Sequence, residues 1–151
     1  TKVNFKIKNL GMNVDGSFTG LKGMLEFNID DFSATKFKVT IDAKSINTGI
    51  GMRDDHLRKK EYFDVVQFPV IQFSSTKVVK GNAGEGIITG KLTIKNVTKE
   101  ISFPFTYAIN NGSPRFKGEF KINRRDYQVG GNSMSLADEL TVILDVSFKK
   151  P

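Results

Sequence analysis

His56 is the only histidine in this 151-residue chain, and it lies in a charge-dense segment between residues 45 and 68. Asp54, Asp55 and Glu61 lie close to it in the sequence. A carboxylate-rich metal site or a general acid–base pair would use these residue types. The chain has no cysteine, which excludes thiolate metal ligands, thiol nucleophiles and disulfides. A small enzyme centred on this segment is one hypothesis. The simpler interpretation is that His56 forms a hydrogen bond that only supports the fold.

The rest of the chain shows an alternation of apolar and polar residues with a period of two, which is typical of β-strands. The alternation is clear over residues 3–7, 25–29, 37–43, 88–94, 101–109, 116–122 and 140–148. Two weaker strands are predicted over residues 14–21 and 70–77. The clearest turn pairs are Asp15-Gly16, Gly81-Asn82, Asn111-Gly112 and Gly130-Gly131. Short connections of this kind predict an all-β protein with antiparallel neighbours.

The apolar face of such a sheet must be covered, and closure into a barrel or folding into a sandwich does so. The polar faces carry lysines, and a barrel of eight strands has no room for them inside, so the apolar face is expected to be the inner one. We therefore expect one domain, residues 1–151, of eight or nine antiparallel strands around an apolar interior. Pro104 faces outward, so its strand is expected to lie at an edge or a bulge.

The charge-dense segment departs from this alternation and favours a short helix. Acidic residues at 54–55 precede basic residues at 58–60, an order that complements the dipole of a helix. The sequence predicts a helix near residues 52–61 that crosses one end of the barrel, with Asn47 or Thr48 as its cap.

Several motifs extend this prediction. The most specific are Ser45-Ile46-Asn47-Thr48, Arg53-Asp54, His56-Leu57-Arg58, Phe63-Asp64, Pro69 and Phe73. Later ones are Gly90-Lys91-Leu92-Thr93-Ile94, Val97-Thr98, Asn123-Arg124, Asp126-Tyr127 and Asp138-Glu139. From Val3 to Phe148 the chain resembles the YceI-like family of lipocalin-like lipid-binding proteins. It departs from the family pattern at Gln128, where a glycine is usual, and it lacks the segment that usually precedes the first strand.

The resemblance implies a closed eight-stranded antiparallel lipocalin-like barrel. Its long apolar channel would bind a polyisoprenoid or prenylated quinone-like lipid, without catalysis and without a cofactor. It also implies a bacterial protein that is periplasmic or secreted, whose leader is not part of this chain, and a homodimer. The inward positions supply the predicted channel residues: Phe5, Ile7, Phe18, Phe37, Val39, Ile41, Leu57, Phe73, Leu92, Ile94, Phe103, Phe105, Phe120, Ile122, Val142 and Leu144.

Three residues are expected at the channel mouth, near the ligand head group: Arg53, His56 and Arg124. Guanidinium groups suit phosphate or quinone oxygens. The alternative is that the arginines form ion pairs, Arg53 and Arg58 with acidic residues of their own segment and Arg124 with Asp126.

The pattern leaves open whether the interior holds a ligand, because the same side chains would fill a packed core of a structural module. Gly90 and Gly118 at inward positions favour a cavity, since larger residues would fill that space. An apolar chain buried there would gain roughly 0.8 kcal/mol per CH₂.

The net charge of +7 favours anionic partners, although solubility alone also accounts for it. The lysines are spread over the outer face, while the 13 phenylalanines fall mainly on the inner face. A single-strand binder would interleave exposed aromatics with a basic patch, so nucleic acid is not expected as a partner. Transient contact with a membrane surface is compatible with this charge.

Overall fold

The structure is a computed structural model that describes residues 1–148. Its strands are β1 (Lys2–Asn9), β2 (Met12–Phe18), β3 (Lys22–Glu26), β4 (Lys36–Asp42), β5 (Val70–Lys80), β6 (Glu85–Ile94), β7 (Val97–Asn110), β8 (Ser113–Asn123) and β9 (Leu136–Ser147). Its helices are α1 (Gly51–Leu57) and the short 3₁₀ helices η1 (Phe32–Ala34), η2 (Ala43–Ser45) and η3 (Arg124–Tyr127).

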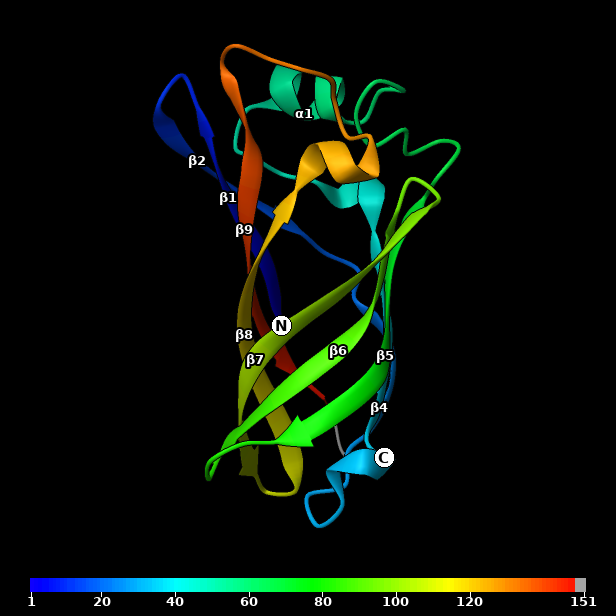
Figure 1. Ribbon diagram of the computed structural model, residues 1–151. Helices are drawn as coiled ribbons and strands as arrows, with labels where there is room; N and C mark the ends of the chain where they lie inside the picture. The colour runs from blue at the N-terminus through cyan, green and yellow to red at the C-terminus, as the bar shows by residue number, and fades with distance from the viewer. Residues whose placement is uncertain (149–151) are drawn as a thin grey trace.

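All the strands belong to one sheet, in the order β2-β1-β9-β8-β7-β6-β5-β4-β3, and every neighbouring pair is antiparallel. The sheet curls into an elongated barrel with α1 across its upper end (Figure 1). The predicted antiparallel barrel with one short helix is confirmed. The prediction of eight strands was wrong, because the described part of the chain forms nine. The stretch from residue 12 to 26 is interrupted after Phe18, so that β2 pairs with β1 and β3 pairs with β4.

The barrel is closed by a chain crossing and not by a continuous ladder. β2 and β3 are the two edges of the sheet, and residues 19–21 carry the chain from one edge to the other. A bridge between Ser17 and Asn47 fastens the crossing on one side. The backbone N–H of Asp42, at the end of β4, donates to Thr19 O at 3.1 Å.

β7 and β8 pair over only part of their length. Their ladder runs from Asn110 with Ser113 to Phe105 with Gly118, and beyond it the two strands diverge (Figure 1). Pro104 comes at this point, and proline has no N–H to donate to a neighbouring strand. β7 stays paired with β6 through Pro104, so this proline lies at a local edge, as predicted.

The first turn of the chain lies at Leu10-Gly11, with φ values of +54° and +76°, and not at Asp15-Gly16. Gly16 is buried inside β2, where a Cβ would overlap the ring of Phe5. The turn prediction for Asp15-Gly16 was therefore wrong, because packing against a cross-strand ring decided the glycine's role. Asn111-Gly112 does form the β7–β8 turn, with φ values of +51° and +80°.

α1 ends earlier than predicted, at Leu57. Its N-cap is Ile50, which supplies no side-chain hydrogen bond, so the caps predicted at Asn47 or Thr48 were wrong. Thr48 instead donates its backbone N–H and its hydroxyl to the buried carboxylate of Asp54, at 2.8 and 2.5 Å. These two hydrogen bonds fasten the loop before α1 to the helix.

Part of the predicted open space is filled by aromatic rings. A Cβ on Gly90 would lie 2.5 Å from the ring of Phe73 and 2.5 Å from Ser74 O. Gly90 therefore makes room for a packed ring, and the expectation that it leaves a cavity was wrong. Gly118 is less tightly covered, with the ring of Phe103 at 3.1 Å from such a Cβ, and it lines the interior space.

Candidate functional site

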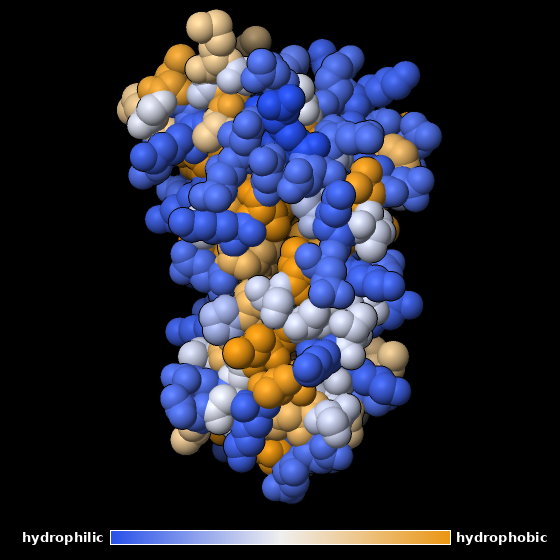
Figure 2. Space-filling view, viewed as in Figure 1, coloured by the Kyte–Doolittle hydropathy of each residue, from blue (hydrophilic) through white to orange (hydrophobic). Residues whose placement is uncertain are grey.

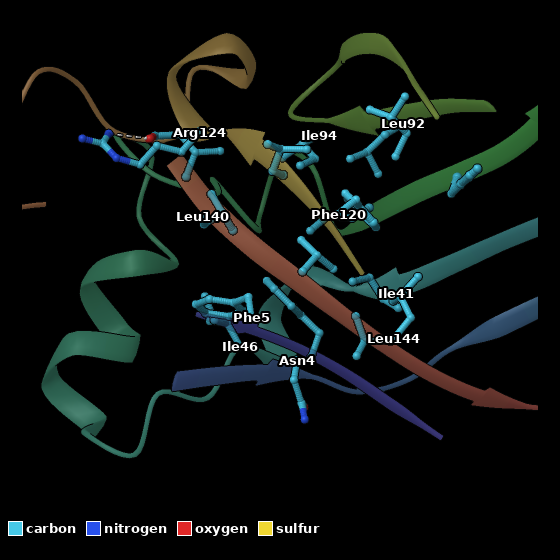
Figure 3. A pocket seen from close by; sticks show the side chains of 18 of the residues that line it. Asn4, Phe5, Ile41, Ile46, Leu92, Ile94, Phe120, Arg124, Leu140 and Leu144 are labelled. Carbon is cyan, nitrogen blue, oxygen red and sulfur yellow. Dashed lines mark hydrogen bonds between the residues drawn. The ribbon is translucent and has the colours of Figure 1, made fainter. Parts of the chain in front are cut away.

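An apolar cavity of about 370 Å³ lies inside the barrel. This volume falls within the range of roughly 300–1,000 Å³ that is common for ligand pockets. All sixteen apolar residues predicted for the channel line the cavity, and so do Arg53, His56 and Arg124. Figure 3 shows how side chains from several strands point into the same space. Their contact with a ligand remains a prediction.

The two walls of the cavity differ in packing. Most inward residues of β4 to β7 are buried, namely Val39, Ile71, Phe73, Val78, Ile88, Leu92, Ile94, Phe103 and Phe105, whereas Phe37, Ile41 and Ile101 are half-buried. On the opposite wall Val3, Phe5 and Val146 are buried, but the other inward residues are half-buried: Ile7 of β1, Phe120 and Ile122 of β8, and Leu140, Val142 and Leu144 of β9. Inward side chains of a close-packed core would be buried. The unfilled space therefore lies mainly against β8 and β9.

Apolar surface also reaches the outside along the front of the barrel. Figure 2 shows apolar atoms between polar ones along this face, including the level at which β7 and β8 diverge in Figure 1. Ile101 of β7 and Ile122 of β8 are half-buried and line the cavity. The interior is thus less completely enclosed than a continuous ladder would make it.

Arg53 is held at the α1 end of the cavity by Thr48. Its Nε donates to Thr48 Oγ1 and its Nη2 donates to Thr48 O, both at 2.7 Å. Nη1 of Arg53 forms no hydrogen bond or ion pair with the part of the chain described here. Of the two ion pairs expected in this segment, the one of Arg58 is confirmed, with its Nη1 2.8 Å from Asp55 Oδ1. Arg53 therefore keeps one donor group for the cavity mouth.

The hydrogen-bond donors of Arg124 are used within the protein. It is 4% exposed, and its guanidinium points away from the cavity (Figure 3). It donates to four carbonyl oxygens: those of Val129 and Gly131 in the η3–β9 connection at 2.9 Å each, and those of Ala137 at 2.9 Å and Leu136 at 3.3 Å at the start of β9. Its carboxylate partner is Asp138 at 3.4 Å, and not Asp126 as the alternative predicted. This geometry does not favour a head-group role for Arg124.

His56 is exposed, and its ring packs against Tyr62 with centroids 5.1 Å apart. Asp54, a candidate partner for acid–base chemistry, accepts hydrogen bonds from Thr48. Residues 1–148 contain no group of three or more His, Asp or Glu side chains placed to hold a metal ion. The geometry around His56 therefore offers little to the enzyme hypothesis.

The strand pattern missed the loop residues that line the cavity. Ile46 is 1% exposed, and Phe63 packs edge-on against Phe18 with centroids 5.5 Å apart. Tyr62 lines the same region. These residues lie in the charge-dense segment, where there is no alternation to reveal an inward face. The adjacent aromatic pair Tyr62-Phe63 was the available signal.

Two pKa shifts arise from the scaffold. Burial raises the pKa of Tyr127 to about 12, and the charge of Asp126 adds to this effect. A hydrogen bond from Arg115 lowers the pKa of Asp145, with which Arg115 forms a two-pronged contact at 2.7 and 2.8 Å. Neither Tyr127 nor Asp145 lines the cavity.

A curled antiparallel sheet around an apolar cavity is the architecture of lipocalin-like barrels. The family model described as the YceI-like domain matches residues 1–148, and the chain belongs to this family. The resemblance read from the motifs is therefore confirmed.

Individual relatives agree with this assignment. Protein YceI of Salmonella arizonae is 33% identical over 95% of this chain and 78% of its own length. The crystal structure of Burkholderia cenocepacia BcnA superposes with a TM-score of 0.93 at 26% identity, over 98% of this chain and 96% of that one. A polyisoprenoid binding domain from Saccharophagus degradans has a TM-score of 0.77 at 15% identity, over 99% and 94% of the two chains, and so shares the fold.

No helix within residues 1–148 is long and apolar enough to cross a membrane.

Proposed function

We propose that this protein binds a long apolar lipid of the polyisoprenoid or prenylated quinone class in the barrel, as a carrier and not as an enzyme. The half-buried side chains that line the cavity, concentrated on β8 and β9, carry this proposal. Side chains that face an unfilled space lose dispersion contacts on that side, and an apolar ligand would supply them. No cofactor is part of the proposed function.

The chemistry of the cavity suits a hydrocarbon chain better than a polar ligand. Its lining is almost entirely aliphatic and aromatic. Ten buried methylene-sized groups would contribute about 8 kcal/mol, before the cost of ordering the chain, which is roughly 4 kcal/mol or more. The affinity therefore depends on the length of chain that is enclosed, and Nη1 of Arg53 offers one donor to an oxygen of the head group.

The relatives support the same class of ligand. The Saccharophagus degradans domain that shares this fold is named for polyisoprenoid binding, and the relatives described above come from bacteria. We propose in addition a periplasmic or secreted location and a homodimer, as the family resemblance suggests. Fractionation of the native host and sedimentation equilibrium of the purified protein would test these two parts.

Native mass spectrometry with organic extraction tests the ligand. Protein purified from its host is expected to carry a prenyl lipid in a near one-to-one ratio, or to take one up when offered prenyl quinones or polyprenyl alcohols. An apo mass that persists after both prenyl lipids and fatty acids are offered would overturn the proposal and leave a packed module.

A pair of variants on β9 locates the site. Leu144→Trp places a larger ring in the cavity, and Ile143→Trp makes the same change on the outer face, where Asn4 and Glu119 are its neighbours across the sheet. If the ring displaces three methylene-sized groups, affinity should fall by about 2.4 kcal/mol, or roughly 60-fold. Equal affinities for the two variants would place the lipid outside the barrel.

A further inference from the structure

The most exposed apolar side chains of the protein gather at one end of the barrel. Five large apolar residues are between 73% and 108% exposed: Leu10, Met12, Met52, Val66 and Met134. No other large apolar side chain in residues 1–148 exceeds 56%. All five lie in connections at the α1 end or, as Met12 of β2 and Met52 of α1 do, at the element ends beside them. This is the upper end in Figure 1, and Figure 2 shows apolar atoms there. Such clustering differs from the scattered apolar residues of an ordinary surface.

Three of these connections are adjacent and form a surface that we name the apolar tip, made of Leu10, Met12, Ile50, Met52 and Met134. The backbone N–H of Leu10 donates to Ser135 O at 2.9 Å, which places the β1–β2 turn beside the η3–β9 connection. The bridge from Ser17 to Asn47 ties β2 to the loop that leads into α1. The tip contains three of the chain's four methionines, whose flexible side chains adapt to irregular apolar surroundings.

The segments that carry the tip contain no charged residue. Residues 9–14, 46–52 and 128–137 are all uncharged, in a chain in which 26% of residues are charged. Exposed charges of both signs flank these segments: Lys8, Lys44 and Arg125, and Asp15, Asp55 and Asp126. An uncharged apolar surface bordered by charged residues suits the interface of a bilayer, and the net charge of +7 favours a bilayer with anionic lipids.

Leu10 has a backbone conformation that leucine does not favour. It is the first of the two central residues of the β1–β2 turn and has a φ of +54°, as a two-residue turn of this kind requires. Asn or Gly adopts this conformation at lower cost than Leu. A leucine that is strained, 77% exposed and without a packing role in the fold indicates a contact with something outside the chain.

The segments of the tip also form the mouth of the cavity. Asn9, Ile46, Ser133 and Ser135 line the cavity and lie in the same three segments. Anything on which the tip docked would therefore lie directly against the mouth of the cavity.

We propose that the apolar tip docks on a bilayer with anionic head groups, so that a lipid passes between bilayer and cavity without crossing water. The transfer step rests on the proposed function, whereas docking itself does not. A protein partner fits less well, because the tip is built from separate turns and element ends and not from a flat sheet or helix face (Figure 1).

Co-sedimentation with vesicles of phosphatidylethanolamine and phosphatidylglycerol, free of prenyl lipid, tests docking. The wild type should bind, and the triple variant Leu10→Asn/Met12→Ser/Met134→Ser should partition at least roughly tenfold more weakly, since less apolar surface enters the interface. The matched control, Ile29→Ser/Ile109→Ser, changes exposed apolar residues away from the tip and should partition as the wild type does.

Leu10→Asn alone separates docking from folding. The turn favours Asn, so the melting temperature should stay equal or rise while vesicle binding falls. Uptake of a prenyl lipid delivered from detergent should be unchanged in the triple variant, which distinguishes failed docking from a failed carrier function.

Three outcomes would overturn the proposal. These are a wild type that is recovered free of vesicles, a control variant that loses as much binding as the triple variant, and a triple variant that alters only the oligomeric state. The last result would assign the tip to contact between copies of the chain.

Discussion

Replacing Arg124 by methionine tests whether this buried arginine serves the fold or the ligand. Methionine keeps the apolar stem and removes every donor of the guanidinium. Three of the lost hydrogen bonds are 2.9 Å long, to Ala137, Val129 and Gly131. At roughly 1–1.5 kcal/mol each, these three bonds predict a loss of about 3–5 kcal/mol in the free energy of unfolding. For a chain of this size that loss corresponds to roughly 10 °C in melting temperature.

The neighbouring Arg125→Met is the matched control. The side chain of Arg125 is 46% exposed, and its contact with Asp138 is 3.7 Å, so a loss of less than about 0.5 kcal/mol is expected. Urea unfolding with an unchanged dependence on denaturant would measure both variants. Arg124→Lys should fall between wild type and Arg124→Met, because an ammonium cannot span the same set of carbonyls.

The reasoning would be refuted if Arg124→Met lost less than about 1 kcal/mol, or if Arg125→Met lost as much. If Arg124→Met had normal stability but much lower affinity for lipid, Arg124 would be assigned to the channel mouth. That result would mean that the guanidinium turns toward the cavity when a ligand is present.

Three further predictions follow from particular packing and titration features. Gly90→Ala should lower the free energy of unfolding by about 1–3 kcal/mol, because its Cβ would meet the ring of Phe73. Gly118→Ala should lower it by less, and thermal unfolding of the two variants measures the difference. The pKa of Tyr127 is raised to about 12, so the stability that its buried neutral phenol contributes is fully present below the pKa of an unfolded tyrosine, near 10, and is lost as pH rises toward 12. Phenolate absorbance should show a tyrosine that titrates near pH 12, and the lack of such a titration would contradict this. His56→Ala should leave lipid binding within about twofold in a titration, since the ring is exposed on Tyr62, and loss of all function would instead support an enzyme.

The alternation of residues along the strands determined most of the lining of the cavity. Because side chains of a strand alternate strictly between two faces, one inward residue places all the others on its strand. Phe5 with Ile7 on β1, and Val142 with Leu144 on β9, could therefore be assigned to the interior from sequence alone. The turn at Asn111-Gly112 was equally local, since it depends only on residues that accept a positive φ.

Contacts between distant residues decided the rest. Gly16 and Gly90 carry no side chain, so only the cross-strand rings of Phe5 and Phe73 reveal that their space is filled. The donors of Arg124 reach several angstroms from its backbone, and the sequence does not show that they end on the carbonyls of a loop.

The sequence could not predict that the interior holds an open cavity, for a related reason. Alternation fixes which face a residue belongs to, but not the distance to the opposite wall. Leu144 and Val39 have the same kind of pattern, yet one is half-buried beside empty space and the other is part of the packed core. The curl of the sheet sets that distance, through the divergence of β7 from β8 and the crossing between β2 and β3. The sequence by itself determined the inward face, and only the tertiary structure decided that this face encloses a cavity.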